Sequence, residues 1–295
     1  MGNVKALRIP FRLFYWTKGL AKLTRVYNLL FLALTQYFTA YFLVDVHHGQ
    51  RAYLTDIRLF LLVFSTVCIA AAGYMINDYY DVKIDLINRP QRVVVGTTLK
   101  RRYVMVGHIA LSMFGILVGF LLSWQVGFIH CGSVFLLWLY SNRLKRLPFI
   151  GNLIIAALSG LAVALVGMYY REQEFLVFTY ALFAFAISLL REIIKDMEDL
   201  PGDQTFGCRT LPVTWGIHRT KHLLYILSTI FVFLLFYLAE KLGNQILITY
   251  FILLVIPITF FIIRLVQADT RRDFTLLNNF CKLLILSGIV SMVFF

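Results

Sequence analysis

Residues 103–142, YVMVGHIALSMFGILVGFLLSWQVGFIHCGSVFLLWLYSN, contain no Asp, Glu, Lys or Arg. A helix that crosses a membrane needs about 20 predominantly apolar residues, so this segment is long enough for two such helices. We place the boundary between them near residues 123–127. The composition agrees with a membrane location, since 60% of the 295 residues are hydrophobic and only 15% are charged. The segment therefore predicts a protein that crosses the membrane several times.

Windows without charged residues continue outward from this segment in both directions. On the N-terminal side, one window lies between Arg25 and Asp45 and another between Arg58 and Asp78. On the C-terminal side the windows cover residues 147–170, 175–190, 222–239, 242–263 and, interrupted by one lysine, 274–295. Together the windows predict an all-α membrane fold, a bundle of nine transmembrane helices. We expect residues 26–295 to form a single polytopic domain, preceded by a basic interfacial segment at 1–25.

The distribution of basic residues predicts the orientation of the chain. All but four of the 28 Lys and Arg residues fall on the same side as the N-terminus; the exceptions are Arg51, Arg58, Arg171 and Lys241. Cytoplasmic segments carry an excess of Lys and Arg, so we predict that the N-terminus and the loops at about 78–102, 140–148 and 191–221 are cytoplasmic. In a bacterium the membrane would be the inner one. We attribute the net charge of +13 to this topology and to anionic headgroups and substrates, and we expect no nucleic-acid partner.

An acidic stripe follows the second predicted helix, in NDYYDVKID at 77–85. On a helix, Asp78, Asp81 and Asp85 fall within about 60° of one another, and Asn77 lies beside them. Like charges at this spacing repel, and ionised groups near the membrane are costly. The stripe therefore predicts compensation by cationic side chains or by metal ions.

A second acidic stripe, KDMEDLPGD at 195–203, repeats the spacing with Asp196, Asp199 and Asp203. Pro201 and Gly202 should end the helix, so we expect Asp203 to reach the site from a loop. Glu198 is expected to face away from the aspartates. Both stripes follow a predicted span and emerge on the same face of the membrane, which predicts a shared site at one end of the bundle.

The residue types at this site indicate magnesium and a phosphorylated amphiphile. Magnesium takes one or two protein carboxylates and completes its shell with water and substrate phosphates. Two facing acidic stripes therefore suit a diphosphate bridged by two magnesium ions. Arginine and lysine side chains would neutralise the remaining phosphate oxygens, arginine through bidentate contacts. The candidates for this role are Arg89, Arg92, Lys145, Arg191, Lys195 and Arg209.

Four elements of this pattern carry a resemblance to a known family. They are NDYYDVKID, the NRPQR that follows it at 88–92, KDMEDLPGD, and GCRTLPVTWG at 207–216. With these elements in this order, the sequence resembles the UbiA-type intramembrane prenyltransferases over nearly the whole chain. The resemblance implies a nine-helix fold, magnesium, and a prenyl diphosphate whose tail lies in a channel open to the lipid bilayer. The allylic C–O bond would ionise with the diphosphate as leaving group, and an acceptor would capture the cation.

The resemblance also implies roles for individual residues. Asp78, Asp81, Asp196 and Asp199 would be catalytic, and the metal ligands would be these four with Asn77, Asp85 and Asp203. Arg25 and Asn28, at the start of the first span, are similar to family positions that face the substrate. In one respect the chain differs, because the family often has Tyr and Lys four residues apart, whereas Tyr140 and Lys145 are five apart.

Within the family, REIIKDMEDLPGD and INRPQRVVVG are most similar to the digeranylgeranylglyceryl phosphate synthases. That branch implies transfer of a geranylgeranyl group to a lipid acceptor, geranylgeranylglyceryl phosphate. An aromatic quinone precursor or a chlorophyll-type acceptor is the alternative, since those branches share much of the pattern.

Other functions, and other roles for these residues, fit the sequence less well. A membrane cation transporter would place ionisable residues near mid-membrane in broken helices, whereas these lie at helix ends beside arginines. A CDP-alcohol phosphotransferase needs Asp-Gly and Ala-Arg elements in one segment, and the chain lacks that arrangement. The acidic stripes could be solvated helix ends, and Arg89 and Arg92 could be topology anchors alone. His218 and His222 have the spacing of helical metal ligands, but we interpret them as polar residues at the membrane interface.

Overall fold

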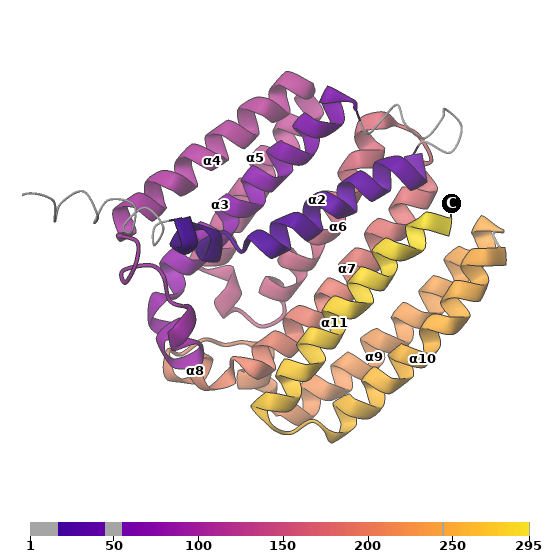
Figure 1. Cartoon of the computed structure of the whole chain (residues 1–295). Coiled ribbons are helices and arrows are strands. Elements are labelled where there is room, and N and C mark those ends of the chain that lie inside the picture. The colour runs from indigo at the N-terminus through magenta and orange to yellow at the C-terminus, as the bar shows by residue number, and fades with distance from the viewer. Residues whose placement is uncertain (1–16, 45–54, 244, 295) are drawn as a thin grey trace, which may run out of the picture. The chain divides into compact units, whose positions relative to one another are not determined.

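The computed structural model describes residues 17–44, 55–243 and 245–294, and these residues are almost entirely helical (Figure 1). The long helices are α2 (Val26–Phe38, continued by the π-helix η1, Thr39–Val44), α3 (Ile57–Asn88), α4 (Arg101–Leu122), α5 (Trp124–Asn142), α6 (Ile150–Tyr170), α7 (Glu174–Glu198), α9 (Leu211–Leu242), α10 (Gln245–Gln267) and α11 (Arg271–Ser291). The short helices are η2 (Pro90–Arg92), η3 (Leu144–Arg146), α8 (Leu200–Thr205) and η4 (Met292–Phe294).

Eight of the long helices in the described ranges are long and apolar enough to cross a membrane. The exception is α5, which is long enough but carries Gln125 and His130 among its apolar residues. The predicted all-α membrane fold is confirmed, and the predicted number of nine spans holds approximately. The predicted boundary near residues 123–127 is also confirmed, because α4 ends at Leu122 and Ser123 is extended, with φ −165° and ψ 157°.

Two helices extend well past the windows without charged residues. The 32-residue helix α3 continues through Asp78, Asp81 and Asp85, and α7 continues through Asp196. At 1.5 Å per residue, α3 is about 48 Å long, whereas the hydrocarbon layer is about 30 Å thick. The backbone hydrogen bonds of a helix do not depend on whether its side chains are charged. A charged residue therefore ends the apolar window without ending the helix. The first acidic stripe and Asp196 of the second therefore lie on the C-terminal parts of long helices.

The chain divides into two compact units, each with its own packing. Unit 1 comprises Met1–Ala33 and Leu61–Asn142, and unit 2 comprises Leu34–Phe60 and Arg143–Phe295. The predicted division into a segment at 1–25 and a domain at 26–295 stays a prediction, and residues 1–16 of that segment lie outside the described residues.

In unit 1, a helix at residues 17–23 packs onto α3, α4 and the turn that follows η2. Leu23 is fully buried against Met75, Val94, Val95, Leu99 and Val104. The turn closes at Gly96, whose φ of +86° is a conformation that glycine adopts without steric cost. Within the helices, His130 Nε2 donates to Ser65 Oγ at 2.9 Å, because the Ser65 hydroxyl itself donates to Leu62 O. Such bonds hold helices together where lipid supplies no polar partner.

In unit 2, α7 lies at the centre of a core that includes residues of α9, α10 and α11 (Figure 1). The largest fully buried side chains of this core include Ile187, Ile193 and Phe261. On another face, α6 approaches α7 closely at Gly160, where a Cβ atom would lie 2.8 Å from the carbonyl oxygen of Ala181. This close approach fixes the register of α6 on α7, and so the position of the residues at the start of α6.

We predict that Gly160→Ala destabilises the protein by about 1–3 kcal/mol, because the new methyl group meets backbone that cannot rotate away. Thermal unfolding in detergent measures the change. Gly132→Ala is the control, since a Cβ atom at Gly132 of α5 meets nothing within 4 Å. An unchanged unfolding temperature in Gly160→Ala would contradict the close packing of α6 on α7.

Candidate functional site

The first acidic stripe lies in unit 1, on the C-terminal part of α3. Asn77, Asp78, Asp81 and Asp85 are all partly buried there, and the Asp78 side chain is 15% exposed. Because α3 is continuous from Ile57 to Asn88, the three aspartates follow one face of the helix as predicted.

Arg25 supplies a counter-charge to this stripe. Its Nη2 donates to Asp78 Oδ1 at 2.8 Å, and its guanidinium carbon lies 4.8 Å from the centre of the Tyr74 ring. Arg25 has a left-handed backbone, with φ +52°, between the helix at 17–23 and α2. Burial alone would lower the pKa of the Arg25 guanidinium, but attraction to Asp78, with smaller contributions from Tyr74 and Asp85, raises it above its ordinary value. The residue predicted to bind the diphosphate is therefore charged and paired with a predicted metal ligand.

The other predicted residues of unit 1 lie on α2 and around η2. Asn28 is exposed in the first turn of α2. Arg89 is partly buried directly before η2, and Arg92 is exposed at its end. Lys22 Nζ donates to Gln91 O at 2.5 Å, which ties the helix at 17–23 to η2. The structure thus brings the helix that carries Lys22 and the NRPQR element together.

The second acidic stripe lies in unit 2, where α7 ends. Asp199 leaves the helical conformation, with φ −93° and ψ 3°, and α8 begins at Leu200 with Pro201 in its first turn. The prediction that Asp203 reaches the site from a loop is wrong, because Asp203 lies within α8. Proline suits the first turn of a helix, where its missing N–H has no partner to lose. It therefore begins a new helix here, and the break falls two residues earlier.

Two carboxylates of this stripe have partners that the sequence did not predict. Asn152 Nδ2, at the start of α6, donates to Asp196 Oδ2 at 2.8 Å, and Asn152 is only 6% exposed. Thr210 Oγ1 donates to Asp203 Oδ2 at 3.2 Å, and Asp203 is 8% exposed. Asn152 is the one amide side chain in the window 147–170. A polar residue in such a window signals a function, and this signal could have identified it.

The predicted basic residues of unit 2 fall into two groups. Arg191 Nη2 lies 2.5 Å from Glu192 Oε1, and Lys195 Nζ lies 3.6 Å from Glu192 Oε2, so both pair with one nearly buried carboxylate. The backbone N–H of Arg209 donates to Arg146 O at 2.8 Å. This bond holds Arg209 against η3, the element that carries Lys145. Tyr140 lies in the last turn of α5.

Further along the chain, the two histidines singled out in the sequence lie on the exposed face of α9. Their ring centres are 4.6 Å apart, and His222 Nδ1 donates to the carbonyl oxygen of His218 at 2.9 Å. This is a local contact within one helix, and the interfacial interpretation stays a prediction.

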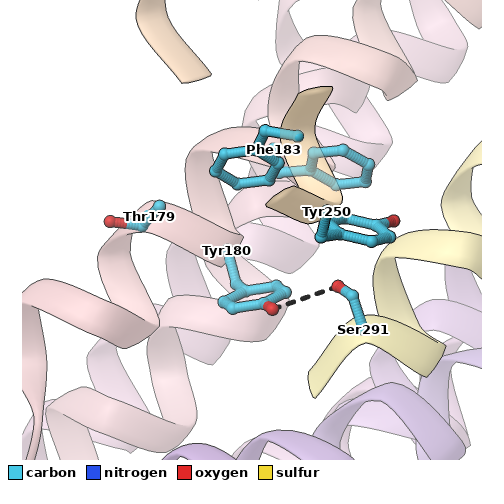
Figure 2. Close-up of a pocket in the computed structure, with 6 residues that line it drawn as sticks. Thr179, Tyr180, Phe183, Tyr250 and Ser291 are labelled. Atoms are coloured by element: carbon cyan, nitrogen blue, oxygen red, sulfur yellow. Dashed lines mark hydrogen bonds between the residues drawn. The ribbon is translucent and has the colours of Figure 1, made fainter. Parts of the chain in front are cut away.

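Two cavities in unit 2 are lined by none of these residues. The smaller has a volume of about 10 Å³, close to what one water molecule needs, and Thr179, Tyr180, Phe183, Tyr250 and Ser291 are among its lining residues. Figure 2 shows the Tyr180 hydroxyl bonded to Ser291 Oγ, at 3.0 Å. The larger, about 270 Å³, is lined by Gln245, Ile246, Thr249, Tyr250, Leu253 and Phe294. Tyr180 precedes Asp196 on α7 by roughly 24 Å at 1.5 Å per residue, so these cavities are not the acidic site.

The donor set of the acidic stripes fits magnesium. Among the residues that the structure describes, no three His, Cys, Asp or Glu side chains form a group able to hold a metal ion. Magnesium, however, ordinarily takes only one or two carboxylates and fills its shell with water and phosphate oxygens. The stripes offer such hard oxygen donors, including Asp81 and Asp199. Because they belong to different units, their sharing of metal ions stays a prediction.

Comparison with known proteins gives consistent matches. The model of the UbiA prenyltransferase family matches residues 37–285. The chain is 37% identical to the digeranylgeranylglyceryl phosphate synthase of Thermococcus sibiricus over 177 residues, which are 60% of this chain and 63% of that protein. It is 31% identical to the synthase of the same name from Methanosphaera stadtmanae over 239 residues, 78% of this chain and 86% of that protein. The alignment with the Thermococcus protein thus spans less than two thirds of that relative's length.

Solved structures share the fold. A structure described as digeranylgeranylglyceryl phosphate synthase in membranes has a TM-score of 0.70 and 24% identity, over 95% of this chain and 99% of that one. A UbiA homologue from Archaeoglobus fulgidus, described as bound to GPP and Mg²⁺, has a TM-score of 0.65 and 17% identity, over 94% and 100%. At these identities the likeness is one of fold.

We predict that Arg25 and Asp78 are energetically coupled by about 1–2 kcal/mol, between the values for exposed and buried ion pairs. The measurement is a double-mutant cycle of Arg25→Met, Asp78→Asn and the double variant, followed by thermal unfolding. The double variant should be less destabilised than the sum of the single variants, because each single change leaves one charge without its partner. Additivity within about 0.5 kcal/mol would show that the pair contributes nothing.

Proposed function

This chain belongs to the UbiA prenyltransferase family, as the resemblance of its motifs predicts, and we propose that it transfers a prenyl group from a prenyl diphosphate to a lipid acceptor. The enzyme class is that of transferases for alkyl groups other than methyl. The observation that carries the proposal is that the family match at 37–285 includes both acidic stripes, NDYYDVKID and KDMEDLPGD.

We propose the following division of roles in the reaction. The bond between C1 of the prenyl group and the diphosphate oxygen breaks, and the diphosphate leaves with the electron pair. A new bond forms between C1 and the acceptor hydroxyl oxygen, which loses its proton. The candidates for stabilising the departing diphosphate are Arg25, Asn28, Arg89, Arg92, Lys145, Arg191, Lys195 and Arg209. Cationic donors aimed at a developing negative charge lower the barrier most where water is excluded.

We assign the metal ligands to Asn77, Asp78, Asp81, Asp85, Asp196, Asp199 and Asp203. Magnesium, when bound, would supply Lewis-acid stabilisation of the leaving diphosphate. The partial burial of Asp78 and the hydrogen bond of Asn152 to Asp196 support this assignment, because a ligand that is held still loses less freedom when an ion binds. We further propose that two magnesium ions are used.

Geranylgeranylglyceryl phosphate is the acceptor and geranylgeranyl diphosphate the donor that we favour. The support is the name shared by the relatives from Thermococcus and Methanosphaera, digeranylgeranylglyceryl phosphate synthase. An aromatic acceptor would use the same leaving-group chemistry, so the acceptor has to be tested separately.

We place the acidic stripes on the cytoplasmic side of the membrane. The chain is an integral multi-pass membrane protein, and eight helices among the residues that the structure describes are long and apolar enough to span a bilayer. The excess of Lys and Arg in the segments that carry the stripes supports a cytoplasmic location.

We predict that the purified protein releases diphosphate from geranylgeranyl diphosphate only when acceptor and Mg²⁺ are both present. The variants Asp78→Asn and Asp196→Asn should each reduce the rate by roughly 10²–10³-fold, because each removes a carboxylate that would hold Mg²⁺ against the leaving diphosphate. Glu174→Gln, at the exposed first turn of α7, is the matched control and should keep wild-type activity. Full activity of either aspartate variant, or full activity in EDTA, would reject the metal role.

We predict that geranylgeranylglyceryl phosphate is prenylated at least 10-fold faster than hydroxybenzoate, dihydroxynaphthoate or homogentisate at equal concentration, because among these acceptors it alone has a free glycerol hydroxyl together with a phosphate and a geranylgeranyl chain. A tenfold rate ratio corresponds to about 1.4 kcal/mol of discrimination. Product formation from labelled geranylgeranyl diphosphate is followed by chromatography. A preference for any of the aromatic acceptors would replace the lipid assignment with the aromatic one.

A further inference from the structure

Two asparagine side chains hold carboxylates of the same helix, α7, and only one of these carboxylates belongs to the acidic stripe. Asn152 Nδ2 donates to Asp196 Oδ2 at 2.8 Å from α6. Asn278 Nδ2 donates to Glu198 Oε2 at 2.9 Å from α11. We propose that Asn152 is a positioning residue for the metal site, which orients the Asp196 carboxylate for a divalent ion. This inference rests on the proposed function.

The backbone around Asn152 places it firmly against α7. Phe149, directly before α6, has φ +65° and ψ −40°, a conformation that a bulky residue rarely adopts. Phe149 packs against the core of unit 2. The chain therefore turns sharply from η3 into α6, and Asn152 occupies the third position of the new helix, only 6% exposed.

The chemistry of an amide donor suits a carboxylate that binds a cation. A carboxylate oxygen has two lone pairs, so a hydrogen bond to Oδ2 fixes the orientation of the group and leaves Oδ1 to coordinate. A neutral amide does not cancel the negative charge, whereas a guanidinium does. Asp78 is held by the guanidinium of Arg25, and Asp196 is held by the amide of Asn152. Asn152 thus orients Asp196 without bringing a cation that a divalent ion would have to displace.

The pair of Asn278 and Glu198 separates this role from ordinary packing. Both asparagines donate to a carboxylate on the last two turns of α7 over nearly equal distances. Glu198 is buried, at 7% exposed, and Asp196 is partly buried. Replacement of either asparagine by leucine keeps the branching at Cγ and removes the donor. A structural role predicts equal effects of the two replacements, and a positioning role predicts a difference in metal binding.

The experiment compares Asn152→Leu with Asn278→Leu in the full chain purified in detergent. Binding of radioactive Mn²⁺ is measured by equilibrium dialysis, with Mn²⁺ alone and with inorganic diphosphate present, so the result does not depend on prenyl transfer. Asn152→Leu should weaken Mn²⁺ binding by about 10–100-fold, the usual effect of losing a hydrogen bond to a metal ligand. Asn278→Leu should leave it unchanged, while thermal unfolding shows a lower stability for both. Asn152→Ala is measured beside them, so that the comparison does not depend on the fit of leucine.

Equal Mn²⁺ affinity of wild type and the Asn152 variants would overturn the inference, and so would equal weakening in Asn278→Leu. Absence of Mn²⁺ binding by the wild type in both conditions would overturn the inference together with the metal site. The predicted binding pattern without any prenyl transfer would support Asn152 as a positioning residue and reject only the proposed function.

Discussion

A carboxylate close to lipid needs a partner, and this requirement governs the parts of the molecule where chemistry can occur. An unpaired ion pays a large desolvation penalty in a medium of low polarity. Asp78 obtains its partner from Arg25, 53 residues earlier in the chain, and this contact requires the left-handed turn that joins the helix at 17–23 to α2. Asp196 obtains its partner from Asn152, and this contact requires the sharp turn at Phe149 and the close approach of α6 at Gly160. Local backbone and helix packing are thus both tied to the acidic residues.

The partners of Asp78 and Asp196 differ in charge. A guanidinium cancels the charge of Asp78, so a divalent ion that binds there has to compete with Arg25. An amide satisfies one oxygen of Asp196 and brings no opposite charge to the carboxylate. Two aspartates at the same position of a repeated spacing therefore present different chemistry to an incoming ion. The basic residues Arg191 and Lys195 are held in a related way, since both pair with Glu192 on their own helix.

Much of the fold follows from the sequence, because lipid demands long apolar helices and charge is rare within them. The break at Ser123, the continuous α3 and the stripe of Asp78, Asp81 and Asp85 all follow from residue spacing. Contacts between distant segments do not follow from spacing. The pairing of Arg25 with Asp78 and of Asn152 with Asp196 depends on which helix faces pack against each other. A single sequence does not show this packing. The prediction of a loop at Asp203 is wrong for a local reason, because proline can end a helix and can also begin one.

The unbroken length of α3 has a consequence for how a reactant arrives. A helix that enters the hydrocarbon at Ile57 and rises 1.5 Å per residue reaches Asp78 after about 31 Å, which is the level of the opposite headgroups. The prenyl diphosphate that we propose as substrate, dissolved by its tail, would carry its phosphates at that same level. Encounter is then a search within a plane, and its rate follows the mole fraction of the prenyl lipid among its neighbours. The encounter rate does not depend directly on the concentration of that lipid in the water.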